Sequence, residues 1–216
     1  MKSIILIAAP AAGKGTEAVI LKEQYNMPHI STGDLLRAAV AKGDERGNMI
    51  NELITNGKFV SDDIVLELLK EKILEPACEN GYILDGFPRN IAQAEAYDKI
   101  LEEIKRDIGI VIVLDIDKEI AKSRISGRYS CPKCGKVYNI NTNLKPINEG
   151  LCDICNIELT RRADDNPDTY EERYNTYLEK TEPLISYYDK KGIVYHVDSG
   201  ISSEETHKQV VKILGE

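Results

Sequence analysis

Apolar runs and amphipathic stretches alternate along this chain, and the alternation predicts strands followed by helices. Largely apolar runs predict strands at about 2–9, 82–85 and 109–115, and a short strand followed by a turn and a helix cap is predicted within 28–34. The last strand is predicted at 192–198. Helical periodicity predicts helices from 17 to 25, in short pieces over 35–74, and at 90–106, 120–127, 168–190 and from 200 onward. The short pieces are predicted to break at 42–44 and 56–58. Strands that alternate with helices predict an α/β fold, an open and mostly parallel sheet that binds ligands at the C-terminal ends of its strands.

The segment between the first strand and the first helix resembles a phosphate-binding loop. Positions 8–16 read A-A-P-A-A-G-K-G-T. Backbone N–H groups and the positive end of a helix dipole point into such a loop, where Lys14 can reach outer phosphates and Thr16 can meet Mg²⁺. The pattern G-x-x-x-x-G-K-[ST] is matched imperfectly, because Ala8 replaces its first glycine and Gly15 separates Lys from Thr. An ordinary tight turn between strand and helix is the alternative.

Two other strand ends carry polar residues. Asp85 ends an apolar strand and is followed by Gly-Phe-Pro-Arg at 86–89. An Asp at this place can hold Mg²⁺ through water, and the alternative is that it caps the next helix. Ser31 and Thr32 follow the second strand, where they can cap a helix and also face a ligand. Arg37 lies one turn further on, and a lone surface Arg is usually only a solvated charge.

Two arginines lie close together around the end of the predicted helix 120–127. Arg124 is on this helix and Arg128 comes just after it. The spacing i, i+4 predicts that both lie on one helix face, where like charges are destabilising. We therefore expect an anion between them.

Four of the five cysteines form two C-x-x-C pairs, Cys131 with Cys134 and Cys152 with Cys155. This pattern predicts a tetrahedral Cys₄ zinc site, although iron and cobalt also fit such a site and four unrelated thiols are the alternative. Four thiolates leave no position for a catalytic water, so the metal is expected to be structural. Cys78 lies outside the pattern and is interpreted as a buried small apolar residue.

Composition restricts the class of protein. The chain has 216 residues, which is enough for one α/β core with a small insertion. Its net charge of −8 argues against nucleic-acid binding through a basic surface. No apolar run reaches the length of a membrane span, and the N-terminal run is interpreted as a core strand rather than a signal peptide. The cysteine pattern favours a reducing, cytoplasmic location. His29, His196 and His207 show no ligand spacing and are interpreted as structural or surface residues.

Taken in order, these motifs resemble the adenylate kinase family, in the long bacterial form with a metal-bearing lid. The resemblance rests on the phosphate loop, the Ser31–Asp34 turn, Asp85–Arg89 with Gln93, the arginines and the inserted cysteines, and it runs nearly end to end. It implies a P-loop NTPase-like, five-stranded parallel sheet flanked by helices. The implied domains are a core at 1–30, 61–127 and 166–216, a helical AMP-binding insertion at 31–60, and a lid with the Cys₄ site at 128–165.

The resemblance also implies an activity. Members of the family transfer the γ-phosphoryl group of Mg·ATP to AMP, giving two ADP, and so balance the adenine nucleotides. The transfer is expected to be reversible, direct and in line, without a covalent intermediate, because an AMP phosphate is already ionised and needs no general base. The implied cofactors are Mg²⁺ with ATP and structural Zn²⁺ in the lid. The implied partners are ATP, AMP and ADP, and the implied state is a monomer.

The site residues implied by the resemblance fall into overlapping groups. The ATP contacts are Ala11, Ala12, Gly13, Lys14, Gly15, Thr16, Arg128, Val137, Tyr138 and Ile201. The AMP contacts are Thr32, Arg37, Lys58, Phe59, Val60, Gly86, Phe87, Pro88, Arg89, Gln93, Arg162 and Arg173. The groups expected around the moving phosphoryl are Lys14, Arg89, Arg124, Arg128, Arg162 and Arg173. Thr16 and Asp85 are associated with Mg²⁺, and the lid metal is held by Cys131, Cys134, Cys152 and Cys155.

The sequence departs from the family at two positions of the loop, where Ala8 and Ala11 replace glycine. A β-carbon at Ala11 is expected either to crowd the phosphates or to require a positive φ. Two other functions stay open at this point. One is a kinase for UMP or CMP, and the other is a zinc-ribbon adaptor for nucleic acid or protein with a vestigial phosphate loop.

Overall fold

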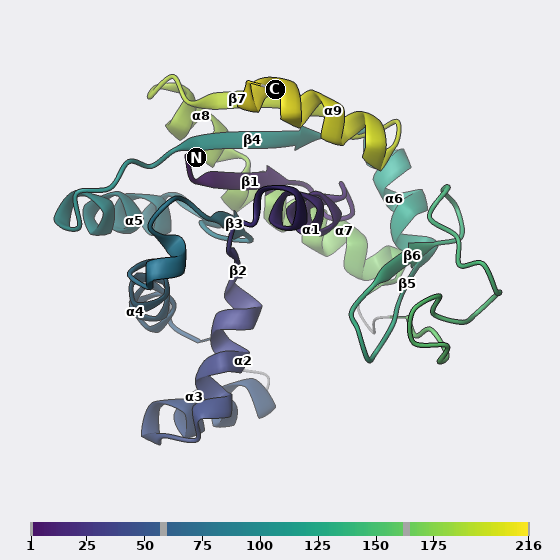
Figure 1. Cartoon of the computed structure of the whole chain (residues 1–216), viewed down its shortest axis with the longest axis horizontal. Helices are drawn as coiled ribbons and strands as arrows, with labels where there is room; N and C mark the ends of the chain where they lie inside the picture. The colour runs from purple at the N-terminus through teal and green to yellow at the C-terminus, as the bar shows by residue number, and fades with distance from the viewer. Residues whose placement is uncertain (1, 57–59, 162–164, 216) are drawn as a thin grey trace. The chain divides into compact units, whose positions relative to one another are not determined.

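The computed structural model describes residues 2–56, 60–161 and 165–215, which form two compact units. The first comprises Met1–Ile7, Ala18–Val113 and Lys180–Tyr195, and the second comprises Ala8–Glu17, Leu114–Glu179 and His196–Glu216. The elements, labelled in Figure 1, are β1 (Ile4–Ala8), α1 (Lys14–Tyr25), β2 (His29–Ser31), α2 (Thr32–Lys42), α3 (Glu45–Thr55), α4 (Asp62–Ile73), η1 (Pro76–Cys78), β3 (Ile83–Asp85), α5 (Ile91–Glu103), β4 (Ile110–Asp115), α6 (Lys118–Ser126), β5 (Arg128–Ser130), β6 (Val137–Asn139), α7 (Pro167–Thr176), η2 (Tyr177–Thr181), α8 (Pro183–Asp189), β7 (Val194–Asp198) and α9 (Ser203–Leu214).

The central element is a five-stranded sheet in the order β2-β3-β1-β4-β7. β1 and β2 both run parallel to β3, and Ile4 and His29 are both in register with Ile83. All five residues of β1 are buried, as are the first five of β4, so both strands carry apolar side chains on both faces. The predicted five-stranded parallel sheet flanked by helices is confirmed.

In the first unit, the predicted run of short helices corresponds to α2, α3 and α4. Ser31 caps α2 by accepting a hydrogen bond from the Asp34 N–H (3.1 Å). Gly43 ends this helix with a left-handed backbone, and the Asp44 side chain then caps α3, which packs against α2 (Figure 1). The break predicted at 42–44 is therefore confirmed. The one predicted at 56–58 lies largely outside the described residues.

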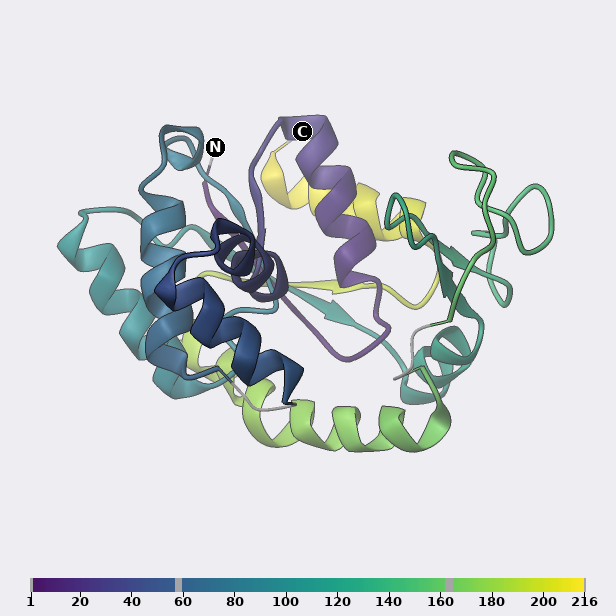
Figure 2. The same cartoon turned by 90° about the horizontal axis from the view of Figure 1, so that it is seen from below.

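In the second unit, α6 ends before it reaches Arg128, so Arg124 and Arg128 do not lie on one helix. The helix stops at Ser126, and Arg128 already belongs to β5. β5 pairs with β6 as an antiparallel ribbon, with Arg128 opposite Asn139, and Figure 2 shows the ribbon and its long loops in green after α6. The prediction that Arg124 and Arg128 share a helix face is wrong, because the chain changes from helix to strand between them. The ribbon itself was not predicted.

The long helix predicted at 168–190 is interrupted. α7 ends at Thr176, a π-helical turn occupies Tyr177–Thr181, and α8 begins at Pro183. Proline has no N–H to donate to the preceding turn, so one regular helix cannot run through this position. Throughout the described ranges, no helix is both long enough and apolar enough to cross a membrane.

Candidate active site

The phosphate loop joins β1 to α1 through residues 9–13. The Ala12 N–H donates to the Ala9 carbonyl (3.2 Å), which closes a tight turn. α1 begins at Lys14, so Lys14 and Thr16 lie in its first turn. Backbone N–H groups in a first turn lack helical partners and are suited to bind an anion.

Ala11 adopts a positive φ, which is one of the two consequences expected for a β-carbon at this position. Its φ is +65°, and Gly13 has a φ of +96°. A left-handed conformation costs a residue with a β-carbon about 1–2 kcal/mol, whereas glycine adopts it freely. The Ala11 side chain packs against a buried cluster formed by Ala121, Ile125 and Tyr170. The loop is therefore in contact with α6 and α7, the helices that carry this cluster.

Glu17, next to Thr16 in α1, is a buried carboxylate. It is 2 % exposed, and its Oε1 lies 2.9 Å from Nδ1 of His207 on α9. Its Oε2 is buried without a hydrogen-bond partner among the residues that the structure describes. Burial raises the pKa of Glu17, and His207 opposes this. The pair ties the first turn of α1 to the C-terminal helix, so His207 is structural, as predicted.

Asp165 gathers two of the predicted phosphate-binding arginines. Arg128 donates to it from Nε (2.7 Å to Oδ2) and from Nη2, and Arg173 Nη1 lies 3.9 Å from its Oδ1. The Asp165 side chain is fully buried and that of Arg128 is 14 % exposed. Two cations around one carboxylate leave a positive charge that can meet phosphate. Sequence reasoning missed Asp165, because nothing in the run at 161–165 indicates which arginine it meets.

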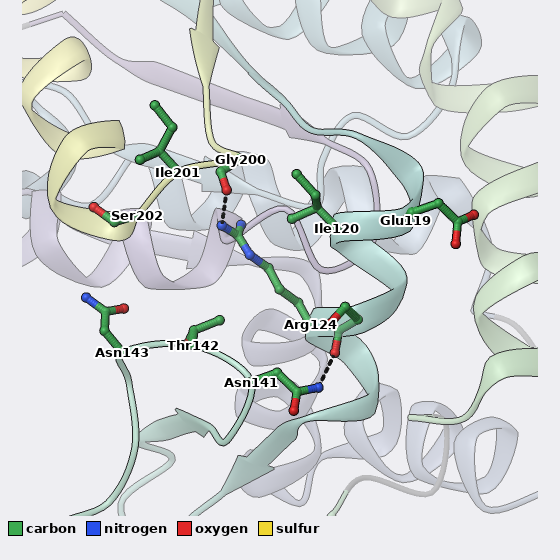
Figure 3. Close-up of a pocket in the computed structure, with 10 residues that line it drawn as sticks. Glu119, Ile120, Arg124, Asn141, Thr142, Asn143, Gly200, Ile201 and Ser202 are labelled. Atoms are coloured by element: carbon green, nitrogen blue, oxygen red, sulfur yellow. Dashed lines mark hydrogen bonds between the residues drawn. The ribbon is translucent and has the colours of Figure 1, made fainter.

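Arg124 lines a cavity of about 620 Å³, shown in Figure 3. Its guanidinium extends from α6 toward the Gly200 carbonyl, to which Nη2 donates (3.1 Å), with Ile120 and Ile201 on either side. Burial lowers the pKa of Arg124, and the nearby Asp198 opposes this, so the side chain stays charged. The cavity combines a planar cation with two apolar side chains, Ile120 and Ile201, and its other lining is mostly polar. The lining residues are Glu119, Ile120, Ser123, Arg124, Asn141, Thr142, Asn143, Gly200, Ile201 and Ser202.

In the first unit, Arg89 is held by the turn that precedes it. Its Nε donates to the Gly86 carbonyl (2.8 Å) and its Nη2 to Thr32 Oγ1 (3.2 Å). The Arg89 N–H donates to Gln93 Oε1 (2.7 Å), and Gln93 Nε2 donates to Asp62 Oδ1 (2.6 Å). The structure thus brings together Thr32, Gly86, Arg89 and Gln93, four of the predicted AMP contacts.

The other predicted residues of this unit differ in their surroundings. Asp85 Oδ2 lies 3.1 Å from His29 Nε2, and Asn90 caps α5, so Asp85 is not the cap of that helix. Arg37 pairs with Asp34 (2.6 Å) on the surface, with 71 % of its side chain exposed. The Phe87 ring is buried edge-on against Tyr97, with ring centroids 5.7 Å apart, and so supports the turn from the core. Lys58, Phe59 and Arg162 lie outside the described residues.

The four paired cysteines converge as predicted. The sulfurs of Cys131, Cys134, Cys152 and Cys155 all lie within 4.8 Å of one another, and the Cys134 and Cys152 sulfurs are 3.6 Å apart. Zn–S bonds of about 2.3 Å in a tetrahedron separate sulfurs by about 3.8 Å, so this arrangement fits a tetrahedral metal ion. Burial and the neighbouring thiols raise the pKa of Cys155. The four sulfurs could therefore hold a metal ion between them.

Tyr138, predicted to contact ATP, has its side chain in this cysteine cluster. Its hydroxyl donates to Cys152 Sγ (3.4 Å) and accepts from the Asp153 N–H (2.8 Å), and it is 2 % exposed. Although burial of the Cys152 thiol opposes it, this hydrogen bond helps to lower the thiol's pKa. The Tyr138 side chain therefore belongs to the cysteine cluster and is hydrogen-bonded to one of its thiols.

Comparison with known proteins decides the family. A family model described as adenylate kinase matches residues 6–193. Proteins named adenylate kinase from Kosmotoga olearia and Archaeoglobus fulgidus are 44 % and 45 % identical over 212 residues, covering 98 % of this chain and 98 % and 97 % of their own. One from Thermotoga maritima is 42 % identical over 216 residues, covering all of this chain and 98 % of its own.

This chain belongs to the adenylate kinase family. The zinc-ribbon adaptor is therefore excluded as the class of the whole chain. The resemblance to adenylate kinases implied that Arg124, Arg128 and Arg173 lie together around the transferred phosphoryl group. In the structure Arg124 donates to the Gly200 carbonyl, whereas Arg128 and Arg173 surround Asp165.

Proposed function

We propose that this chain catalyses the reversible transfer of the γ-phosphoryl group of Mg·ATP to AMP, giving two ADP. The observation that carries the proposal is in the second unit, where Ala11 of the phosphate loop packs on α6 and Arg124 of the same helix lines a cavity. A phosphate loop beside a cavity with a planar cation suits a nucleoside triphosphate.

The donor side follows from this arrangement. The triphosphate is bound by the backbone and side chains of residues 11–16, with Lys14 at the outer phosphates and Thr16 at Mg²⁺. The base enters the cavity, where the Arg124 guanidinium can stack on it and Ile201 provides apolar surface and backbone groups. Arg128 and the backbone of Val137–Tyr138 complete the ATP contacts.

The acceptor side is proposed in the first unit. Arg89 presents a guanidinium already oriented by Gly86 and Thr32, which suits bidentate binding of the AMP phosphate. Gln93 is fixed by Asp62 and so offers an ordered amide for the base. Further contacts come from Arg37, the segment Lys58–Val60, the turn Gly86–Pro88, Arg162 and Arg173.

Phosphoryl transfer requires the protein to supply positive charge and to position the two nucleotides. Two polyanions have to approach in line, and the moving phosphoryl gains charge on its equatorial oxygens. Fixed cations stabilise that charge without reorganising, and these are Lys14, Arg89, Arg128, Arg162 and Arg173. Arg124, expected from the resemblance in the same group, is proposed to contact the base instead. Mg²⁺ brought by ATP would neutralise the phosphates between which the bond breaks, and Thr16 and Asp85 are the residues proposed to associate with it. No side chain forms a covalent intermediate.

Water has to be excluded, since an open site would hydrolyse ATP. We propose that residues 128–165 form a lid that closes for this purpose, that 31–60 form the AMP-binding domain, and that the rest is the core. The cysteine cluster would hold zinc and keep the lid rigid, so that Arg128 and Arg162 arrive in register. The geometry of the four sulfurs supports a tetrahedral metal ion.

Two further expectations complete the proposal. The chain is proposed to work as a monomer in the cytoplasm, binding no nucleic acid and no membrane. The five cysteines, all outside disulfides in the described part of the chain, support a reducing compartment.

A coupled assay of ADP formation tests the function. Mg·ATP is mixed with AMP, UMP, CMP or GMP in turn, and the rate of ADP production is followed by absorbance. We expect turnover with AMP and at most a small fraction of it with the others. Preference for UMP or CMP would identify a different acceptor, and no turnover with any of the four would refute the proposal.

A further inference from the structure

Ala11 keeps a β-carbon where the backbone favours glycine. Its φ of +65° is one that a residue with a β-carbon holds only when the surrounding structure enforces it. Gly13, two residues later, also has a positive φ, and this position is occupied by glycine. No atom lies within 4 Å of the place where a β-carbon of residue 13 would stand. The methyl group at Ala11 therefore requires a packing explanation.

The explanation is the cluster against which Ala11 packs. Ala121 and Ile125 of α6 and Tyr170 of α7 are each fully buried, and Ala11 covers this cluster from the loop side. The contact requires a β-carbon, because glycine at this position would leave the cluster without the methyl group.

The two helices under Ala11 are themselves fastened together. The Tyr170 hydroxyl donates to the Lys118 carbonyl (3.1 Å), and Glu171 pairs with Lys118 (2.7 Å) and Lys122 (3.2 Å). We call these joined helices, α6 and α7, the lid-stem platform, because α6 ends at Ser126 and α7 begins at Pro167, on either side of the proposed lid.

We propose that Ala11 is a positioning residue for the phosphoryl donor: its methyl group fixes the phosphate loop on the lid-stem platform before the nucleotide binds. This inference rests on the proposed function. The backbone of the loop binds the phosphates in that function, so the methyl group acts through the conformation of the loop. A loop that is already fixed loses less conformational freedom on binding, which strengthens binding.

Ala11→Gly tests the proposal, since it removes the methyl group and keeps each backbone N–H. We expect the KM for ATP to rise about three- to ten-fold, with kcat and the KM for AMP within about two-fold of the parent chain. In nucleotide-free protein, amide exchange at residues 11–13 should become about five-fold faster or more. If the β-carbon instead crowded the phosphates, the KM for ATP would fall. A fall, or a change of less than two-fold, overturns the proposal.

Two variants separate anchoring from general destabilisation. Ala11→Ser retains the β-carbon, so its KM for ATP should rise less than that of Ala11→Gly. Ala41→Gly, at an exposed position of α2, weakens a helix elsewhere and should leave that KM unchanged. A KM for ATP that rises as much in Ala11→Ser as in Ala11→Gly, or that rises in Ala41→Gly, contradicts the proposal. If the parent chain forms no ADP from ATP and AMP, the proposed function fails, and the exchange rates still decide whether Ala11 anchors the loop.

Discussion

At the scale of single residues, Asp165 has two cationic neighbours and a side chain with no exposed surface. Its bidentate contact with Arg128 fixes the plane of that guanidinium, which is the condition for bidentate binding of phosphate. The carboxylate compensates one of the two charges, so the pair of arginines keeps a net attraction for an anion. Asp165 thus holds two arginine side chains close together at one buried carboxylate.

Asp165→Asn keeps the shape and removes the charge. Arg128 is then left partly buried without a counter-charge, and we expect the free energy of unfolding to fall by about 3 kcal/mol. Chemical denaturation measures this. Glu171→Gln is the control, because its exposed pairs with Lys118 and Lys122 contribute only about 0–1 kcal/mol. Equal losses in the two variants would contradict the role given to Asp165.

Lys14 is expected to act on the donor phosphates. Lys14→Ala should lower kcat by about 100-fold or more, because a fixed cation at the moving phosphoryl is lost. Lys22→Ala, an exposed lysine in the last turn of the same helix, serves as the matched control. Steady-state kinetics with ATP and AMP compare the two. Near-normal turnover in Lys14→Ala would refute the assignment.

Arg89 is expected to act on the acceptor. Arg89→Ala should lower kcat/KM for AMP by about 100-fold or more, and Arg89→Lys should restore little, because lysine lacks the planar fork. Arg46→Ala is the control, since Arg46 makes its own bidentate pair with Glu71 in an exposed setting. An Arg89→Ala enzyme with unchanged use of AMP would show that the acceptor phosphate binds elsewhere.

At the scale of elements, the cysteine segment folds around its four sulfurs. Each C-x-x-C pair is followed by a residue with positive φ, Gly135 (+74°) or Asn156 (+51°), whose N–H donates to the carbonyl of the first cysteine of the pair. The buried cluster of the segment consists of two of these cysteines and Tyr138. So small a core provides little stability of its own, and we expect a bound metal to stabilise the segment.

Metal removal should therefore unfold the lid without unfolding the core. A chelator is expected to release the metal, expose residues 128–165 to protease and abolish phosphoryl transfer, while the sheet keeps its cooperative transition. Cys134→Ser should lose metal, and Cys78→Ala should retain it, because Cys78 is buried outside the cluster. Unchanged lid melting and unchanged activity after chelation would show that the metal does not hold the lid.

At the scale of the whole molecule, the sequence predicted what local patterns determine. Apolar runs indicated the strands, and the position of Ser31 indicated that it caps a helix. The C-x-x-C spacing indicated that four sulfurs converge. Patterns could not show tertiary partners, such as Asp165 for Arg128.

The errors have the same origin. A helical period alone did not reveal that α6 stops before Arg128, or that Pro183 interrupts the long helix. The predicted nucleotide contacts remain predictions, and those at Lys58, Phe59 and Arg162 lie outside the described residues.

The central claim is that fixed cations bring two nucleotides together so that one phosphoryl passes directly between them, shielded from water. Phosphorus NMR of the metal-loaded protein with Mg²⁺, ATP and AMP tests this most directly. We predict that ATP and AMP decline in equal amounts, that ADP appears at twice that amount, and that no inorganic phosphate is released. Release of phosphate, or a mixture that stays unchanged, would contradict the account.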